Sequence, residues 1–86
     1  MKVYVDVLVA FGEDGTMTPR QIVWEDGRRF DIDRVSDVRP AAAMKAGGSG
    51  DRYTIWVGGA CRYLFFERSA AIRGSNIGRW FLERAV

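Results

Sequence analysis

Residues 2–11 alternate between two kinds of side chain with a period of two. One set of alternate positions is wholly apolar: Val3, Val5, Val7, Val9 and Phe11. This period and the many β-branched residues are typical of a β-strand, because successive side chains of a strand point to opposite faces of a sheet. The segment therefore predicts that the chain folds around a β-sheet.

Five further segments are predicted to be strands, and glycine-containing turns separate most of them. They are residues 20–25, 28–33, 52–57, 60–67 and 79–85. Val35 and Val38 are three positions apart, which breaks the alternation and predicts a β-bulge or bend near residues 34–37. Residues 40–46 are predicted to be irregular or strand-like, and residues 47–50 and 69–78 are predicted to be loops.

The first predicted hairpin turns at an Asp-Gly pair, and two registers are open to it. A three-residue loop of residues 25–27 pairs Ile22 with Phe30. A two-residue loop would instead pair Ile22 with Asp31. We expect the longer loop, because it places apolar residues on the same face of both strands.

The second predicted hairpin turns at a pair of glycines. A three-residue loop with Gly59 in a left-handed conformation sets Ile55 opposite Cys61 and Tyr53 opposite Tyr63. Cys61 would then lie on the apolar face of its strand. A buried, unreactive thiol is the expectation there.

The length of the chain limits the architecture that these strands can build. With 86 residues, of which 48% are hydrophobic, the chain is predicted to form one β-barrel-like domain over residues 1–86. We predict an all-β fold of about six antiparallel strands in a meander, closing into a small SH3-like or similar barrel. Closure is favoured because it removes exposed strand edges. A domain this small has a thin stability margin, so a dimer would help it.

The chemical inventory excludes most catalytic schemes. The chain has no histidine and a single cysteine, Cys61, so it lacks an internal disulfide, the usual zinc ligand sets and any imidazole. Asp31, Asp33 and Asp37 lie close together, but arginines are interleaved with them. We expect a charged outer face there in place of a metal site. We therefore predict no enzymatic activity, no cofactor and no metal.

The charge of the chain is nearly balanced but unusual in composition. Basic residues number 13 and acidic residues 11, and the net charge of +2 does not by itself imply a polyanionic partner. Eleven of the basic residues are arginines. Two explanations are open: the arginines pair with aspartates on the sheet surface, or they recognise a phosphate or a partner.

The hydropathy pattern and the single cysteine are used to predict where the protein is located in the cell. No run approaches the roughly 18 apolar residues of a membrane span, and Asp6 interrupts the apolar start. We expect no membrane segment and no signal peptide. A lone cysteine fits a reducing compartment, so we predict a cytoplasmic protein.

The aromatic residues are too many for one face of the sheet. Strand alternation sets Trp56 against Ile55 and Phe66 against Phe65, so a second, partly apolar face is predicted. Its expected members are Trp56, Leu64, Phe66 and Phe81, with Arg52, Arg62 and Arg79 beside them.

Three explanations of this second face stay open. The segment 69–78 and the first strand cover it as part of a core, or it forms a homodimer surface, or it contacts a protein or nucleic-acid partner. We predict a non-enzymatic interaction module that binds a protein partner or itself through this aromatic and arginine surface. The alternative is a nucleic-acid-binding accessory protein.

Three short stretches also carry a family resemblance. They are VWEDGRRFDIDRV at residues 23–35, RYT at 52–54 and RWFLE at 79–83. Together they resemble small uncharacterised all-β proteins of Gram-positive bacteria, some of which are encoded near lesion-bypass (Y-family) DNA polymerases. The resemblance covers most of the chain, except that a shorter hairpin would be expected in place of residues 69–78. It implies an accessory or binding role in DNA repair and brings no catalytic residue.

Overall fold

The computed structural model describes residues 1–41, 50–68 and 78–84, and it confirms an all-β fold. These ranges hold seven strands and no helix. The strands are β1 (Lys2–Phe11), β2 (Met17–Val23), β3 (Arg29–Asp31), β4 (Arg34–Pro40), β5 (Gly50–Val57), β6 (Ala60–Arg68) and β7 (Gly78–Glu83). The seventh strand is β4, which the sequence pattern left as a bulged or irregular continuation of residues 28–33.

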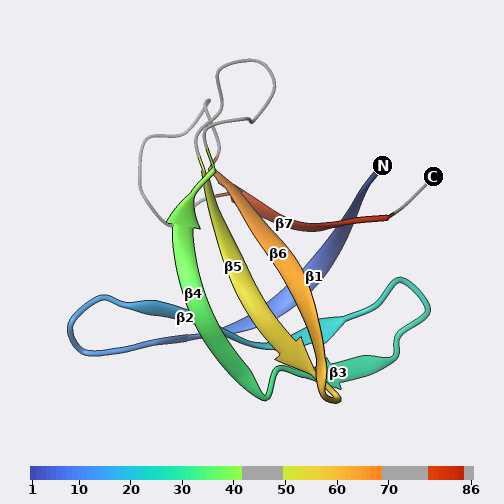
Figure 1. Ribbon diagram of the computed structural model, residues 1–86, viewed down its shortest axis with the longest axis horizontal. Coiled ribbons are helices and arrows are strands. Elements are labelled where there is room, and N and C mark those ends of the chain that lie inside the picture. The colour runs from blue at the N-terminus through green and yellow to red at the C-terminus, as the bar shows by residue number, and fades with distance from the viewer. Residues whose placement is uncertain (42–49, 69–77, 85–86) are drawn as a thin grey trace.

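All seven strands belong to one curled antiparallel sheet with the order β3-β2-β1-β7-β6-β5-β4. Its two edges, β3 and β4, are joined by only Ile32 and Asp33. The amide of Ile32 donates to the Arg20 carbonyl at 2.9 Å, and that of Asp33 to the Trp56 carbonyl at 2.8 Å. The chain thus passes from one edge of the sheet to the other, and the sheet curls into a half-barrel (Figure 1).

The first hairpin has the predicted register, with Ile22 opposite Phe30. Its loop requires a left-handed residue, and Gly27 supplies it with φ of 88°. The Asp26 carboxylate accepts a hydrogen bond from the Arg28 amide at 3.0 Å, which fixes the turn.

The predicted bulge is confirmed as well. The pairing of β4 with β5 shifts register between Val35 and Asp37. A second shift, which the sequence pattern did not predict, lies between Leu8 and Val9 in the pairing of β1 with β2. Bulges increase the local bend of a sheet, so both help it to curl.

The second hairpin differs from the prediction by one residue. Gly58 and Gly59 form a two-residue loop, with φ of 56° and 81°. Two consecutive positive φ values are what a type I′ turn requires, and a pair of glycines adopts them without strain. A slip of one residue reverses the faces of a strand. Leu64 therefore faces the core. Cys61 lies on the outer face and is exposed, so the prediction of a buried thiol is wrong.

The core lies inside the curl of the sheet and is wholly apolar apart from one phenol. Its buried members are Ile22, Ile32, Tyr53, Ile55, Leu64, Phe66 and Trp80. Burial removes solvent from the Tyr53 hydroxyl, and this desolvation is the main cause that raises its pKa. In the described ranges no charged side chain is buried.

Residues 42–49 and 69–77 fall outside the described structure, so most of the expectations for residues 40–46, 47–50 and 69–78 do as well. Three described residues of these segments belong to strands: Pro40 ends β4, Gly50 begins β5 and Gly78 begins β7. Ala41 follows β4 and belongs to no strand. Across the described parts of the chain, no helix has the length and apolarity to cross a membrane.

Candidate binding surface

The residues expected on the second apolar face divide between the two sides of the sheet. Leu64 and Phe66 point into the core and are 0% and 2% exposed. Their expected place on a surface with Trp56 is wrong, because the two-residue Gly-Gly loop reverses the faces of β6. Both side chains belong to the core inside the curl of the sheet.

Phe81 does lie on the outer face of the sheet, yet it is only 2% exposed. Its ring stacks on Phe65 with centroids 4.9 Å apart and meets the edge of Tyr4 at 5.7 Å. The Lys2 ammonium lies 4.7 Å from the centre of the same ring. Neighbouring side chains from β1 and β6 thus cover Phe81 and remove it from any contact surface.

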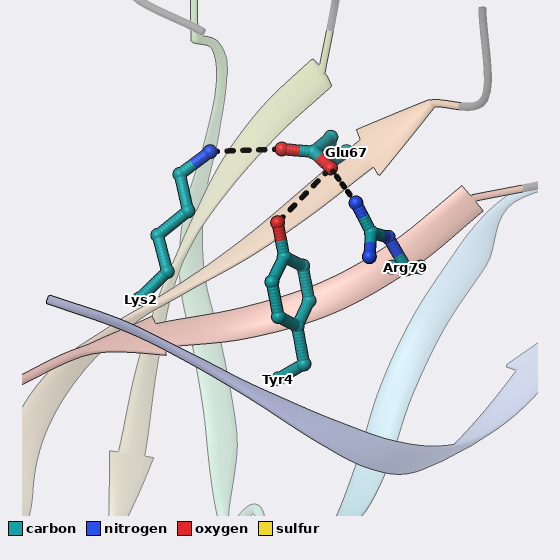
Figure 2. Close-up of polar contacts among 4 residues, drawn as sticks. All are labelled: Lys2, Tyr4, Glu67 and Arg79. Atoms are coloured by element: carbon teal, nitrogen blue, oxygen red, sulfur yellow. Dashed lines mark hydrogen bonds and ion pairs between the residues drawn. The ribbon is translucent and has the colours of Figure 1, made fainter. Parts of the chain in front are cut away.

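A polar network lies beside Phe81 and is centred on Glu67 (Figure 2). The Glu67 carboxylate accepts hydrogen bonds from Lys2 Nζ at 2.9 Å, the Tyr4 hydroxyl at 3.3 Å and Arg79 Nη2 at 3.0 Å. The hydrogen bond from Lys2 is the largest cause that lowers the pKa of Glu67, and Arg79 adds to it. We call these four residues the Glu67 network. Arg79, expected on the binding surface, is ion-paired within this network, whose two cations and one carboxylate leave one positive charge.

Two arginines on the outer face of β4 and β5 each lie over an aromatic ring. The Arg34 guanidinium carbon is 4.9 Å from the centre of the Trp56 ring, and that of Arg52 is 4.5 Å from the Tyr63 ring. The indole Nε1 of Trp56 donates to Ser36 Oγ at 3.3 Å, which helps to hold the ring. We call these four side chains the arginine–aromatic face: Arg34, Trp56, Arg52 and Tyr63.

The arginine–aromatic face carries positive charge that no acid offsets in the described ranges. All 11 acidic residues of the chain lie within those ranges. Six ion pairs form there, and neither Arg34 nor Arg52 takes part in one. The nearby Asp37 pairs with Arg39 at 2.7 Å. Arg52 Nε is buried and has no hydrogen-bond partner among the described residues.

Solvent reaches most of this surface. Tyr63 is 50% exposed, Arg34 is exposed, and Trp56 and Arg52 are half-buried. Exposed rings next to unpaired arginines are typical of surfaces that bind other molecules.

Arg62 was expected on the same face as Trp56, and the structure places it elsewhere. It pairs with Ile55, whose side chain is in the core, so Arg62 takes the opposite side of β6 from Tyr63 and is exposed beside the hairpin loop. Two members of the arginine–aromatic face were missed from the sequence. Tyr63 could have been found by choosing the two-residue Gly-Gly loop, whereas the contact of Arg34 depends on the pairing of β4 with β5.

The clustered aspartates separate in the structure. Asp31 accepts a hydrogen bond from Gln21, Asp33 Oδ2 accepts one from the Gly58 amide at 3.0 Å, and Asp37 pairs with Arg39. Within the described ranges no three carboxylate or thiol groups are placed to hold a metal ion.

An open hollow of about 530 Å³ lies where β1 diverges from β7. It is lined by Tyr4, Val5, Asp6, Val7, Gly78, Arg79 and Trp80. The lining of the hollow contains one carboxylate, that of Asp6, and one guanidinium, that of Arg79. Arg79 is already ion-paired with Glu67.

Comparison with known proteins adds no second line of support. The chain matches no protein-family model, and no curated protein and no solved structure is similar to it. The resemblance to small all-β proteins encoded near lesion-bypass polymerases stays a prediction. A function is therefore proposed from the geometry of the chain.

Proposed function

We propose that this chain is a non-enzymatic binding module whose contact surface is the arginine–aromatic face. One observation carries the proposal: Arg34 and Arg52 are held over Trp56 and Tyr63 and have no acidic partner in the described structure. Such an arrangement suits a partner that carries negative charge.

The geometry explains why an anion would bind. A guanidinium stacked on a ring uses its flat face, which leaves the N–H donors at its edge for a bidentate contact with a carboxylate or phosphate. A cation–π contact at an exposed site contributes about 0.5–1 kcal/mol. Each ring thus restricts its arginine before the partner arrives, which lowers the entropy that binding must overcome.

Two further observations support a role in binding over one in catalysis. The carboxylates with lowered pKa values have structural partners: Asp14 and Asp26 accept hydrogen bonds from turn amides, and Glu67 centres its network. The chain also lacks histidine, the commonest general base. We propose a cytoplasmic location as well, because the single, exposed Cys61 fits a reducing compartment.

A binding assay with two simple polyanions tests the proposal. We expect the protein to bind a labelled oligonucleotide or an oligo-glutamate peptide at low salt. An Arg34→Gln, Arg52→Gln double variant should bind about tenfold more weakly or worse, since each charge-assisted contact is worth about 1.5–3 kcal/mol.

The matched control is an Arg20→Gln, Arg29→Gln double variant. It removes the same charge from two exposed arginines of β2 and β3 that also lack an acidic partner in the described ranges. The control should bind like the unmodified protein. An equal loss in both variants, or no binding to either polyanion, would contradict the proposal.

Self-association is the second candidate, and exposed apolar residues favour it. Leu8 and Phe11 of β1 are 46% and 55% exposed. If they form a dimer contact, sedimentation should show a dimer that Phe11→Glu converts to a monomer. A monomer at all concentrations would contradict this candidate.

A further inference from the structure

We infer that the partner of the arginine–aromatic face is a single-stranded nucleic acid. The inference rests on the proposed function and names the class of molecule that the same four side chains would recognise. Its support comes from the spacing of the rings, from the way the guanidiniums are presented and from the position of the surface within the sheet.

The spacing of the two rings fits an unstacked strand. Tyr63 is paired with Thr54, two residues from Trp56, so Trp56 and Tyr63 are diagonal neighbours on adjacent strands. The backbones of diagonal neighbours on one face of a sheet lie about 7–8 Å apart, which sets the spacing at which the two side chains leave the sheet. Successive bases of a duplex rise by only about 3.4 Å, and their faces are already covered. A flexible single strand can spread neighbouring bases to reach both ring–arginine pairs.

The two guanidiniums provide the other contacts that a nucleotide requires. The face of each guanidinium that is turned away from its ring can stack on a base, since bases stack on arginine planes as well as on aromatic rings. The N–H donors of Arg34, and those of Arg52 other than its buried Nε, can contact the adjacent phosphate. One ring with its arginine thus offers both a stacking surface and a phosphate contact. Six described arginines lie over rings, and among them only those at Trp56 and Tyr63 take part in no ion pair.

The position of the surface disfavours an acidic peptide. Extended peptides commonly bind by adding a strand to an exposed sheet edge, where their backbone hydrogen bonds supply much of the affinity. Trp56 and Tyr63 lie on β5 and β6, which are both flanked by paired strands. Only side chains are available here, and stacking is an interaction that bases offer and acidic side chains do not.

Fluorescence anisotropy with four labelled probes tests the inference. The probes are oligo-dT, oligo-rU, a DNA duplex of equal charge and an oligo-glutamate peptide. We expect oligo-dT and oligo-rU to bind at least several-fold more tightly than the duplex or the peptide. Binding should weaken with salt at a slope of about −1.4 in log K against log salt, which is the value for two phosphate contacts on a single strand.

Two substitutions separate stacking from charge. Trp56→Leu and Tyr63→Leu keep an apolar side chain and every charge, and Tyr63 is exposed enough for its variant to fold. Each should weaken oligo-dT binding about tenfold, within the range measured for base–aromatic stacking. Tyr53 and the other core residues are left intact, and thermal unfolding confirms that the variants fold.

The outcomes distinguish this inference from the proposed function. Equal binding of duplex and single strand, or unchanged affinity in both leucine variants, overturns the inference. Binding of the peptide alone, lost on substitution of Arg34 and Arg52, overturns the inference but supports the proposed function. No binding to any probe overturns both. A difference between oligo-dT and oligo-rU supports the inference and shows that the 2′-hydroxyl or the thymine methyl group is read.

Discussion

Trp56 lies directly opposite Cys61 next to the loop of the β5–β6 hairpin, with both on the outer face of the sheet. Since alternate residues of a strand point the same way, this pair places Tyr63 outside and Leu64 inside. The same pairing assembles the arginine–aromatic face and leaves the Cys61 thiol exposed. The register of this one hairpin therefore decides which β6 side chains can reach a partner.

Reactivity of the single thiol checks that register. We predict that Cys61 in the folded protein reacts with a disulfide reagent at nearly the rate of the unfolded chain, because it is exposed. The reaction is followed by absorbance with and without denaturant. Strong protection in the folded protein would show that Cys61 faces the core and that the hairpin has the other register.

Alanine substitutions at adjacent positions give a second check through stability. Leu64→Ala should lower the free energy of unfolding by about 2–5 kcal/mol, since it removes a fully buried side chain and leaves a cavity. Tyr63→Ala, on the exposed face, should cost about 1 kcal/mol or less. Urea unfolding measures both variants. The reverse order of the two effects would contradict the assignment of faces.

Gly78 at the start of β7 is predicted to tolerate no side chain. A Cβ at this position would overlap the carbonyl oxygen of Glu67 on the paired strand β6. Backbone must move to accept it, so Gly78→Ala should destabilise the protein by about 1–3 kcal/mol. Glu83→Ala, an exposed change on the same strand, should stay within about 0.5 kcal/mol. Equal thermal stability of the two variants would contradict the close approach.

The Glu67 network predicts a pH dependence of stability. Its hydrogen bonds lower the pKa of Glu67 below the value in the unfolded chain, chiefly through Lys2. The folded protein therefore gains stability at a pH above the ordinary glutamate pKa, and this gain is lost as the pH falls through the lowered value. Glu67→Gln should cost about 1 kcal/mol near neutral pH, because Glu67 is partly screened by water. The difference from the unmodified protein should shrink as the pH falls below the ordinary glutamate pKa, and a difference that stays constant would contradict the prediction.

Strand positions could be predicted from the sequence wherever one face of a strand is apolar. The alternation in residues 2–11 predicted β1 correctly. Matching the apolar faces of the first hairpin predicted the pairing of Ile22 with Phe30, which the structure confirms. The same matching failed at the second hairpin, because both faces of β6 are rich in apolar residues, such as Leu64 on one side and Phe65 on the other. Turn chemistry was the better guide there, since a Gly-Gly pair accepts two positive φ values.

The candidate surface was only half predictable for a related reason. Trp56 and Arg52 alternate with core residues of one strand, so their shared outer face follows from a period of two. Arg34 comes into contact with Trp56 through the pairing of β4 with β5, and the sequence pattern did not predict β4 as a separate strand. The chain around Arg34 is also bulged, which removes the regular alternation from which a face could be assigned.

The most direct measurement is an amide NMR titration of the protein with oligo-dT. We predict that the largest shifts map to Arg34, Arg52, Trp56 and Tyr63 and include the Trp56 indole N–H, while the Glu67 network changes little. Shifts confined to the hollow between β1 and β7, or no shifts at concentrations where the oligonucleotide is in large excess, would contradict the arginine–aromatic face as the binding surface.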